Sequence, residues 1–133
     1  MKTKFSAHWK KSKQPRKKRK YLKNAPLHIK RSFLSAHLSK ELRKKYNRRS
    51  IPVRKGDKVK VMRGSFKGKT GIVDRVDVRK TRVYIRGIEI VKMEGSKITK
   101  FVHPSNLEII ELNLEDKERK KILERSGKNV KAH

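Results

Sequence analysis

Short runs of alternating apolar and polar residues dominate the middle of the chain. Five such runs lie between Pro52 and Leu112, and turn sequences such as RGSFKGKTG, VRKTR, MEGS and HPSN separate them. A period of two is typical of a β-strand with one buried face. The predicted strands are residues 58–63, 71–78, 82–86, 98–102 and 107–111. Five short strands in about sixty residues favour a small, strongly bent antiparallel barrel over a sandwich, which usually needs about seven strands.

A helical period precedes the strands, in residues 24–47. Leucines recur at helical spacings there, at Leu27, Leu34, Leu38 and Leu42. The pattern predicts two short helices, or one helix interrupted near Ser35. Pro26 suits a first helical turn, Ser39 is a good N-cap for a second helix, and Asn47 can end it. We expect the leucines to pack on the following strands and the Lys and Arg side chains to face outward.

A further helix is predicted after residue 112, since the charges there match the helix dipole. Acids come early in this segment and cations come late, at Glu115, Asp116, Lys120, Lys121 and Arg125. Asn113 can cap the helix, Gly127 can stop it, and Glu115 stands in i,i+4 register with Arg119. Two alternatives stay open for this helix. Ile122 and Leu123 dock it on the barrel, or it is solvated on all sides.

Charge changes the picture of what this chain binds. The 133 residues contain 41 Lys and Arg against 12 Asp and Glu, a formal net charge of +29, which destabilises a compact state through self-repulsion. A polyanionic partner would supply the missing countercharge, and nucleic acid is the expected one. An anionic membrane surface would require an amphipathic helix with a continuous apolar face or a lipidation signal, and neither is evident.

The charge is unevenly distributed, and this divides the chain. Residues 1–50 contain 19 Lys and Arg but a single acid, Glu41. Composition changes near Ile51 and Pro52 from basic and non-periodic to rich in Val and Ile. We therefore expect four segments: a basic RNA-binding arm (1–23), a helical N-terminal extension (24–50), the barrel (51–112), and a C-terminal helix and tail (113–133).

The arm has too little apolar surface to offset its ordering entropy, so it is expected to be disordered until a nucleic acid binds it. Trp9 and Tyr21 lie among its lysines and favour contact with bases or riboses over a merely solubilising tail or a nuclear-import-like cluster at PRKKRK. The expected contact residues of the arm are Trp9, Arg16, Lys17, Lys18, Arg19, Lys20 and Tyr21.

The loop RGSFKGKTG combines glycine with positive charge. Gly64, Gly68 and Gly71 permit a positive φ and close approach of another backbone, while Arg63, Lys67 and Lys69 make a phosphate-facing surface. Three residues separate Gly64 from Gly68, so the loop does not match the nucleotide-binding spacing G-x-x-x-x-G-K-[ST]. A plain hairpin turn with solvated lysines is the alternative, and the charge of the whole chain favours phosphate contact.

These residues carry a resemblance. The stretch RKGDKVKVMRGSFKGKTGIVDRV resembles the KOW motif, and the stretches NAPLHIKRSFLSAHLSKELRKKYNRRSIPVRKGD, VHPSNLEI and DKERKKILER are similar to large-subunit ribosomal protein twenty-four, whose eukaryotic counterpart is numbered twenty-six. Ile72 departs from the basic residue often found there, and the short C-terminal extension favours the archaeal type.

The resemblance implies an SH3-like KOW barrel that binds the first (5′) domain of large-subunit rRNA in the cytoplasmic ribosome. It also implies a place near the peptide tunnel exit, neighbouring large-subunit proteins as partners, and a role in initiating subunit assembly. Further expected rRNA contacts are Arg31, Arg48, Arg49, Arg54, Lys55, His103, Ser105 and Asn106. For HPSN a purely structural turn is an equal alternative.

No catalytic, metal or cofactor site is predicted, and no small-molecule substrate. The five histidines pair with no acid or second histidine at ligand spacing, and there is no cysteine. Asp74 and Asp77 lie three apart on a predicted strand and point to opposite faces. The sequence also lacks a long apolar run and a signal peptide, so we expect a soluble intracellular protein.

The alternative function is that of a KOW-bearing transcription or RNA-processing factor. Such a factor would carry a folded α/β domain ahead of the KOW motif. Residues 1–50 show no strand-like run, which favours the ribosomal protein.

Overall fold

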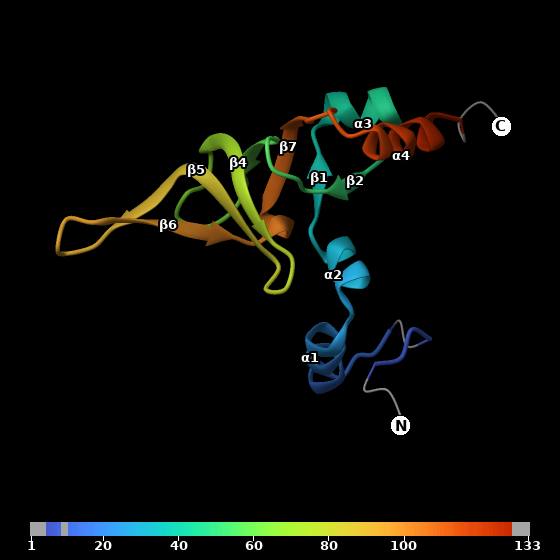
Figure 1. Cartoon of the computed structure of the whole chain (residues 1–133), viewed down its shortest axis with the longest axis horizontal. Helices are drawn as coiled ribbons and strands as arrows, with labels where there is room; N and C mark the ends of the chain where they lie inside the picture. The colour runs from blue at the N-terminus through green and yellow to red at the C-terminus, as the bar shows by residue number, and fades with distance from the viewer. Residues whose placement is uncertain (1–4, 9–10, 129–133) are drawn as a thin grey trace.

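One mixed sheet of seven strands organises the fold of this computed structural model, which describes residues 5–8 and 11–128 (Figure 1). The neighbouring strands follow the order β2-β1-β7-β3-β4-β5-β6. All pairs are antiparallel except β1 with β7. The strands are β1 (Ser35–Leu38), β2 (Ser50–Pro52), β3 (Lys58–Val61), β4 (Thr70–Asp77), β5 (Arg82–Val91), β6 (Lys97–Val102) and β7 (Leu107–Glu111).

The sheet bends around a core of aliphatic side chains, so the predicted small barrel is confirmed. Register shifts interrupt the pairs β3–β7, β4–β5 and β5–β6, and such irregularities let a sheet curve. The most buried strand residues alternate with half-buried or exposed ones, as the period of two predicts, and include Val59, Val61, Val73, Val83, Ile85 and Ile109. All five predicted strands are present, and β5 runs beyond its predicted end to Val91.

Two short helices precede the barrel strands, as predicted: α2 (Leu27–Phe33) and α3 (Lys40–Tyr46). Pro26 immediately precedes α2. The Ser39 hydroxyl accepts a hydrogen bond from the Leu42 amide at 3.4 Å and so caps α3. Asn47 ends α3 in the left-handed conformation, with a φ of 49°.

Strand β1, between these helices, was not predicted, so the statement that residues 1–50 lack a strand is wrong. Ala36 and Leu38 are fully buried on one face of β1, which pairs with β2 and β7. Leu34 and Leu38 are four residues apart, a spacing that a helix face shares. The extension therefore contributes a strand to the barrel sheet, and the change in composition near residue 51 is not a break in that sheet.

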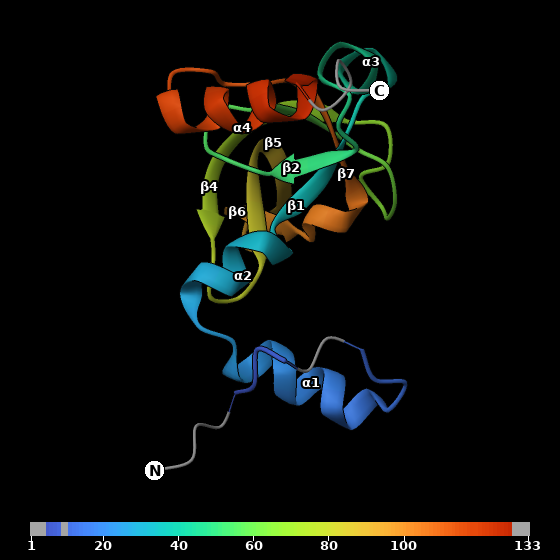
Figure 2. The same cartoon turned by 90° about the vertical axis from the view of Figure 1, so that its right-hand side faces the viewer.

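Helix α1 (Pro15–Asn24) lies within the arm that we expected to be disordered (Figure 2). Pro15 occupies the first turn, and Lys and Arg favour helix. No residue of α1 is buried, and the helix stands apart from the barrel, joined to it through α2. The Tyr21 and Phe33 rings, 5.9 Å apart, connect α1 to α2. Local helix propensity and the ring contacts of Tyr21, rather than burial in the core, favour the helix in this segment.

Helix α4 (Lys117–Lys128) is docked rather than solvated on all sides. Leu123 is 4% exposed and belongs to the core, and α4 packs beside α3 (Figure 1). The Asp116 carboxylate accepts a hydrogen bond from the Glu118 amide at 3.0 Å, so Asp116 caps the helix one turn after the predicted Asn113. Gly127 lies inside α4, and the prediction that it stops the helix is wrong. One glycine costs a helix only about 1 kcal/mol.

Candidate nucleic-acid interface

Helix α1 presents the densest positive charge of the described residues. Its ten residues hold six Lys and Arg and no acid. The predicted contact residues on it are all exposed, namely Arg16, Lys17, Lys18, Arg19 and Lys20. The helix gains little from packing, since none of its residues is buried, and it offers exposed cations to a phosphate backbone.

Of the two aromatic residues predicted to contact RNA from the arm, the structure describes only Tyr21. Trp9 lies outside the described residues. The Tyr21 ring is half-buried, with the rings of Phe5 and Phe33 at 5.0 and 5.9 Å. Tyr21 thus takes part in the packing that holds α1 against α2, and base contact by Tyr21 stays a prediction.

The glycine loop between β3 and β4 is a tight turn closed by backbone hydrogen bonds. The Gly68 amide donates to the Val61 carbonyl at 2.8 Å, and the Val61 amide donates to the Lys69 carbonyl at 2.9 Å. Gly64 and Gly68 have φ values of 95° and 88°, and a Cβ at either would meet nothing within 4 Å. Positive φ is therefore the reason for both glycines, and the space beside them is open to a ligand.

Gly71 serves a different purpose, close approach of two strands. A Cβ on Gly71 would lie 2.7 Å from the Arg86 carbonyl oxygen and 2.7 Å from Cγ2 of Ile85. No side chain fits between β4 and β5 at this point. The predicted close approach of a backbone is confirmed at Gly71.

The cations of the loop are exposed, and one is held in place. Arg63, Lys67 and Lys69 are all exposed. The ammonium groups of Lys69 and Lys100 lie over the Phe66 ring, 5.0 and 5.6 Å from its centre. Lys100 was missed, because only the folding of the loop back onto β6 brings it to Phe66. This contact restrains the charged end of Lys69 at the surface.

The HPSN turn forms a short 3₁₀ helix, η1 (Pro104–Asn106), beside this loop. His103 Nδ1 accepts a hydrogen bond from the Ser105 amide at 3.2 Å and contacts Ser105 Oγ at 2.7 Å. The Asn106 carbonyl accepts a bond from the Met62 amide at 2.8 Å, at the start of the loop. These contacts explain the motif as a structural turn. RNA contact by His103, Ser105 and Asn106 stays a prediction.

The remaining predicted arginines and lysines fall into two groups. Arg31, Arg49 and Lys55 are exposed. Arg48 donates to the Ser50 carbonyl at 2.7 Å and to the Ser126 hydroxyl at 3.3 Å, and Arg54 forms an ion pair with Asp116. Arg48 and Arg54 therefore have partners within the protein, which reduces their availability to RNA.

Three of these cations share one open pocket of about 410 Å³, which Arg31, Arg54 and Lys55 line together with Glu115 and Asp116. The acids offset part of the positive charge in this pocket. It is therefore a weaker candidate for phosphate binding than α1 or the glycine loop.

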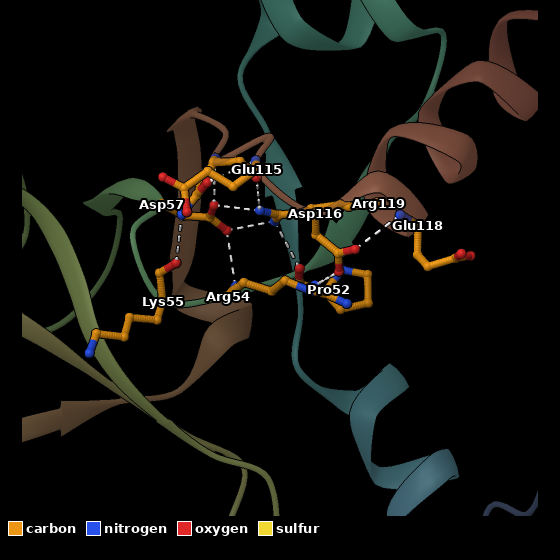
Figure 3. A network of polar contacts seen from close by, with 9 residues as sticks. Pro52, Arg54, Lys55, Asp57, Glu115, Asp116, Glu118 and Arg119 are labelled. Carbon is orange, nitrogen blue, oxygen red and sulfur yellow. Dashed lines mark hydrogen bonds and ion pairs between the residues drawn. The ribbon is translucent and has the colours of Figure 1, made fainter.

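The strongest polar feature is a buried ion pair that the sequence did not predict (Figure 3). Arg119 of α4 donates to both carboxylate oxygens of Asp57, at 2.5 and 2.6 Å, and both side chains are almost fully buried. The backbone amides of Arg54 and Asn113 also donate to Asp57, at 3.0 and 2.9 Å. Glu115, the predicted i,i+4 partner of Arg119, is exposed and does not pair with it.

The described residues offer no metal site, because they contain no group of three His, Asp or Glu side chains placed to hold an ion. Asp74 pairs with Arg86 at 3.5 Å, and Asp77 accepts a hydrogen bond from the Lys80 amide at 3.2 Å. No helix in the described part of the chain is both long and apolar enough to cross a membrane.

Comparisons with known proteins agree on one family. The family model of ribosomal proteins L26 of eukaryotes and L24 of archaea matches residues 12–126. A protein of Methanosphaera stadtmanae named large ribosomal subunit protein uL24 is 48% identical over 114 residues, covering 86% of this chain and 97% of the relative. A protein of the same name from Korarchaeum cryptofilum is 48% identical over 120 residues, covering 90% of this chain and 92% of the relative.

Proposed function

Since the chain belongs to the family of eukaryotic L26 and archaeal L24 ribosomal proteins, it is a structural protein of the large ribosomal subunit, and we propose that it binds the rRNA of that subunit through α1 and the glycine loop. Members of this family are not enzymes, as the sequence predicted. The family also decides against the alternative of a KOW-bearing transcription or RNA-processing factor.

The chain binds the 5′ domain of large-subunit rRNA near the peptide tunnel exit, contacts neighbouring large-subunit proteins, and helps to initiate assembly. Residues 1–23 act as the RNA-binding arm and residues 24–50 as the N-terminal extension. Residues 51–112 form the KOW barrel, and residues 113–133 form the C-terminal helix and tail.

The exposed, acid-free row of cations on α1 is the observation that carries the proposal. A folded protein gains nothing by placing six cations on a helix that buries no residue, because like charges at i,i+4 destabilise the helix. A polyanion reverses that penalty and releases its counterions on binding. The exposed Arg63, Lys67 and Lys69 add a second basic surface on the barrel itself.

The proposal is tested by titrating an rRNA 5′-domain fragment with the whole chain at several salt concentrations. We expect the logarithm of the affinity to fall by about 0.7 to 0.9 per neutralised phosphate for each logarithmic unit of salt. A variant with Gln at the five α1 positions 16–20 should bind more weakly and show a smaller slope. A control variant with Gln at Lys120 and Lys121 of α4 should keep both values nearly unchanged. An affinity independent of salt would refute the proposal.

A further inference from the structure

Arginine and aromatic side chains alternate across the outer face of strands β4, β5 and β6. Arg75 of β4 lies opposite Tyr84 of β5, and Tyr84 lies opposite Phe101 of β6. Arg82 is two residues before Tyr84 on the same strand, so it shares that face. The intervening Val83 and Val102 are buried, which shows that these four side chains point away from the core.

Each arginine lies over an aromatic ring. The Arg75 guanidinium carbon is 4.2 Å from the centre of the Tyr84 ring, and that of Arg82 is 4.0 Å from the centre of the Phe101 ring. Both distances are well inside the roughly 6 Å limit for a cation–π contact. Contact with a ring restrains the guanidinium. The arginine side chain therefore loses less conformational entropy when it binds a ligand.

The face is open and its arginines are not neutralised. Phe101 is 42% exposed. Among the described residues neither Arg75 nor Arg82 forms an ion pair. Asp77 lies opposite Arg82, and its carboxylate instead accepts a hydrogen bond from the backbone of the β4–β5 turn. That turn adds two exposed cations, Arg79 and Lys80.

The exposed Phe101 ring and the half-buried Tyr84 ring, both beside arginines on a sheet, suit unpaired bases. A base stacks on an aromatic ring or on a guanidinium plane, whereas a duplex hides its base faces and offers phosphates and riboses. Phosphate binding alone requires only the arginines, whereas the exposed part of the Phe101 ring adds an apolar surface that a base can cover. The net charge of +29 favours an anionic strand over a protein surface.

We propose that Arg75, Arg82, Tyr84 and Phe101 form a stacking platform for unpaired bases of RNA, with Arg79 and Lys80 holding the adjoining phosphates. The platform deepens the proposed rRNA binding and rests on it. It involves neither α1 nor the glycine loop, and none of its residues was among the contacts expected from the sequence.

The test compares two RNA probes of about twelve nucleotides, a single-stranded oligouridylate and a duplex, by fluorescence anisotropy with the whole chain. Replacing both rings (Tyr84→Leu with Phe101→Leu) should weaken single-strand binding about tenfold or more, as loss of base stacking does. Duplex binding and the salt slope should stay nearly unchanged, because no cation is removed. Ile72→Leu, at an exposed apolar position of β4, is the matched control.

A milder pair of substitutions guards against misfolding of the ring variant. Arg75→Lys with Arg82→Lys keeps the charge and removes the planar group, so it should weaken single-strand binding and leave duplex binding unchanged. Circular dichroism of each variant reports whether the barrel is folded. Crosslinking of a thiouridine-containing strand should in addition yield adducts on the peptides of β5 and β6.

The outcomes separate the platform from the proposed function. If the wild-type chain fails to bind the rRNA fragment, both the proposed function and the stacking platform are wrong. If it binds, but the folded ring and lysine variants bind the single strand as tightly as the wild type, only the platform is wrong. Variants that bind RNA normally yet enter ribosomal subunits poorly would show that this face contacts a protein, which also overturns the platform.

Discussion

Removing the guanidinium of Arg119 is predicted to destabilise the fold far more than removing any exposed charge on α4. The guanidinium donates to both oxygens of Asp57 and to the Asn113 and Pro52 carbonyls, at 3.0 and 3.1 Å. Arg119 thus joins three segments: the last residue of β2, the turn before β3 and the loop before α4 (Figure 3). Arg119→Met keeps the bulk and the helix propensity of the side chain and removes all four bonds.

The expected loss in the free energy of unfolding is about 3 to 5 kcal/mol, the usual cost of breaking a buried ion pair from one side. Asp57 is 0% exposed, so its carboxylate would remain in the core with only two backbone amides as donors. A domain of this size is stable by about 5 to 15 kcal/mol, so the variant would lose a large part of its stability.

Urea unfolding followed by far-UV circular dichroism measures this loss. Lys120→Met, at the exposed neighbouring position, is the control and should change stability by about 0.5 kcal/mol or less. Asp57→Ala combined with Arg119→Met should cost less than the sum of the two single changes, because neither charge is then left unpaired. A loss below about 1 kcal/mol for Arg119→Met would refute the reasoning, since that is the range of an exposed ion pair.

Three further predictions concern the arm and the glycine loop. Deleting residues 1–23 should leave the strand signal in circular dichroism intact, because α1 buries no residue, and should weaken rRNA binding, because it removes the cations of α1. Loss of the strand signal would contradict this prediction. Lys67→Ala and Lys69→Ala should each reduce the salt slope of rRNA binding by about 0.7 to 0.9 with little change in stability; unchanged slopes would leave the loop a plain hairpin. Gly71→Ala should lower the free energy of unfolding by about 1 to 3 kcal/mol through overpacking, and Gly68→Ala by about 1 kcal/mol or more because of its positive φ. Urea unfolding measures both losses, and wild-type stability in either variant would contradict the prediction.

Strands β3, β5 and β7 could be predicted because in each of them buried residues alternate with more exposed ones. In β3 the sequence KVKV places Val59 and Val61 in the core and leaves two lysines on the other side. A period of two with glycine-containing turn sequences on both sides favours a strand over a helix. The turns were equally readable, since Gly64 and Gly68 occupy positions where only a residue tolerant of positive φ fits without strain.

Strand β1 could not be predicted, because its local pattern fits two structures. Leu34, Ala36 and Leu38 are all buried, with spacings of two and four that suit either a strand or one turn of helix. The choice is made by β7, which pairs with β1 in parallel from about 70 residues away along the chain. No window of local sequence contains that information.

The same limit applies to the polar contacts of the candidate site. Arg119 had a local partner at i−4, Glu115, and the folded chain pairs it with Asp57, which is 62 positions away. The platform on β4, β5 and β6 depends on strand register, including a shift between Val73 and Arg75. Sequence therefore predicted which segments carry charge, while the fold determines which charges meet a partner.

The positions of the acids divide the Lys and Arg side chains into those that stabilise the fold and those left for a ligand. Each of the five ion pairs between described residues uses an acid at position 57 or later: Asp57, Asp74, Glu111, Asp116 and Glu118. None of these pairs involves α1. Where an acid is within reach, as for Arg54 and Arg119, the cation joins α4 to the barrel. Along α1 no acid pairs with the cations, so their charge stays uncompensated in the free protein and raises its self-repulsion. RNA would remove that repulsion on binding, so the cations that do least for the fold are those best placed to bind rRNA.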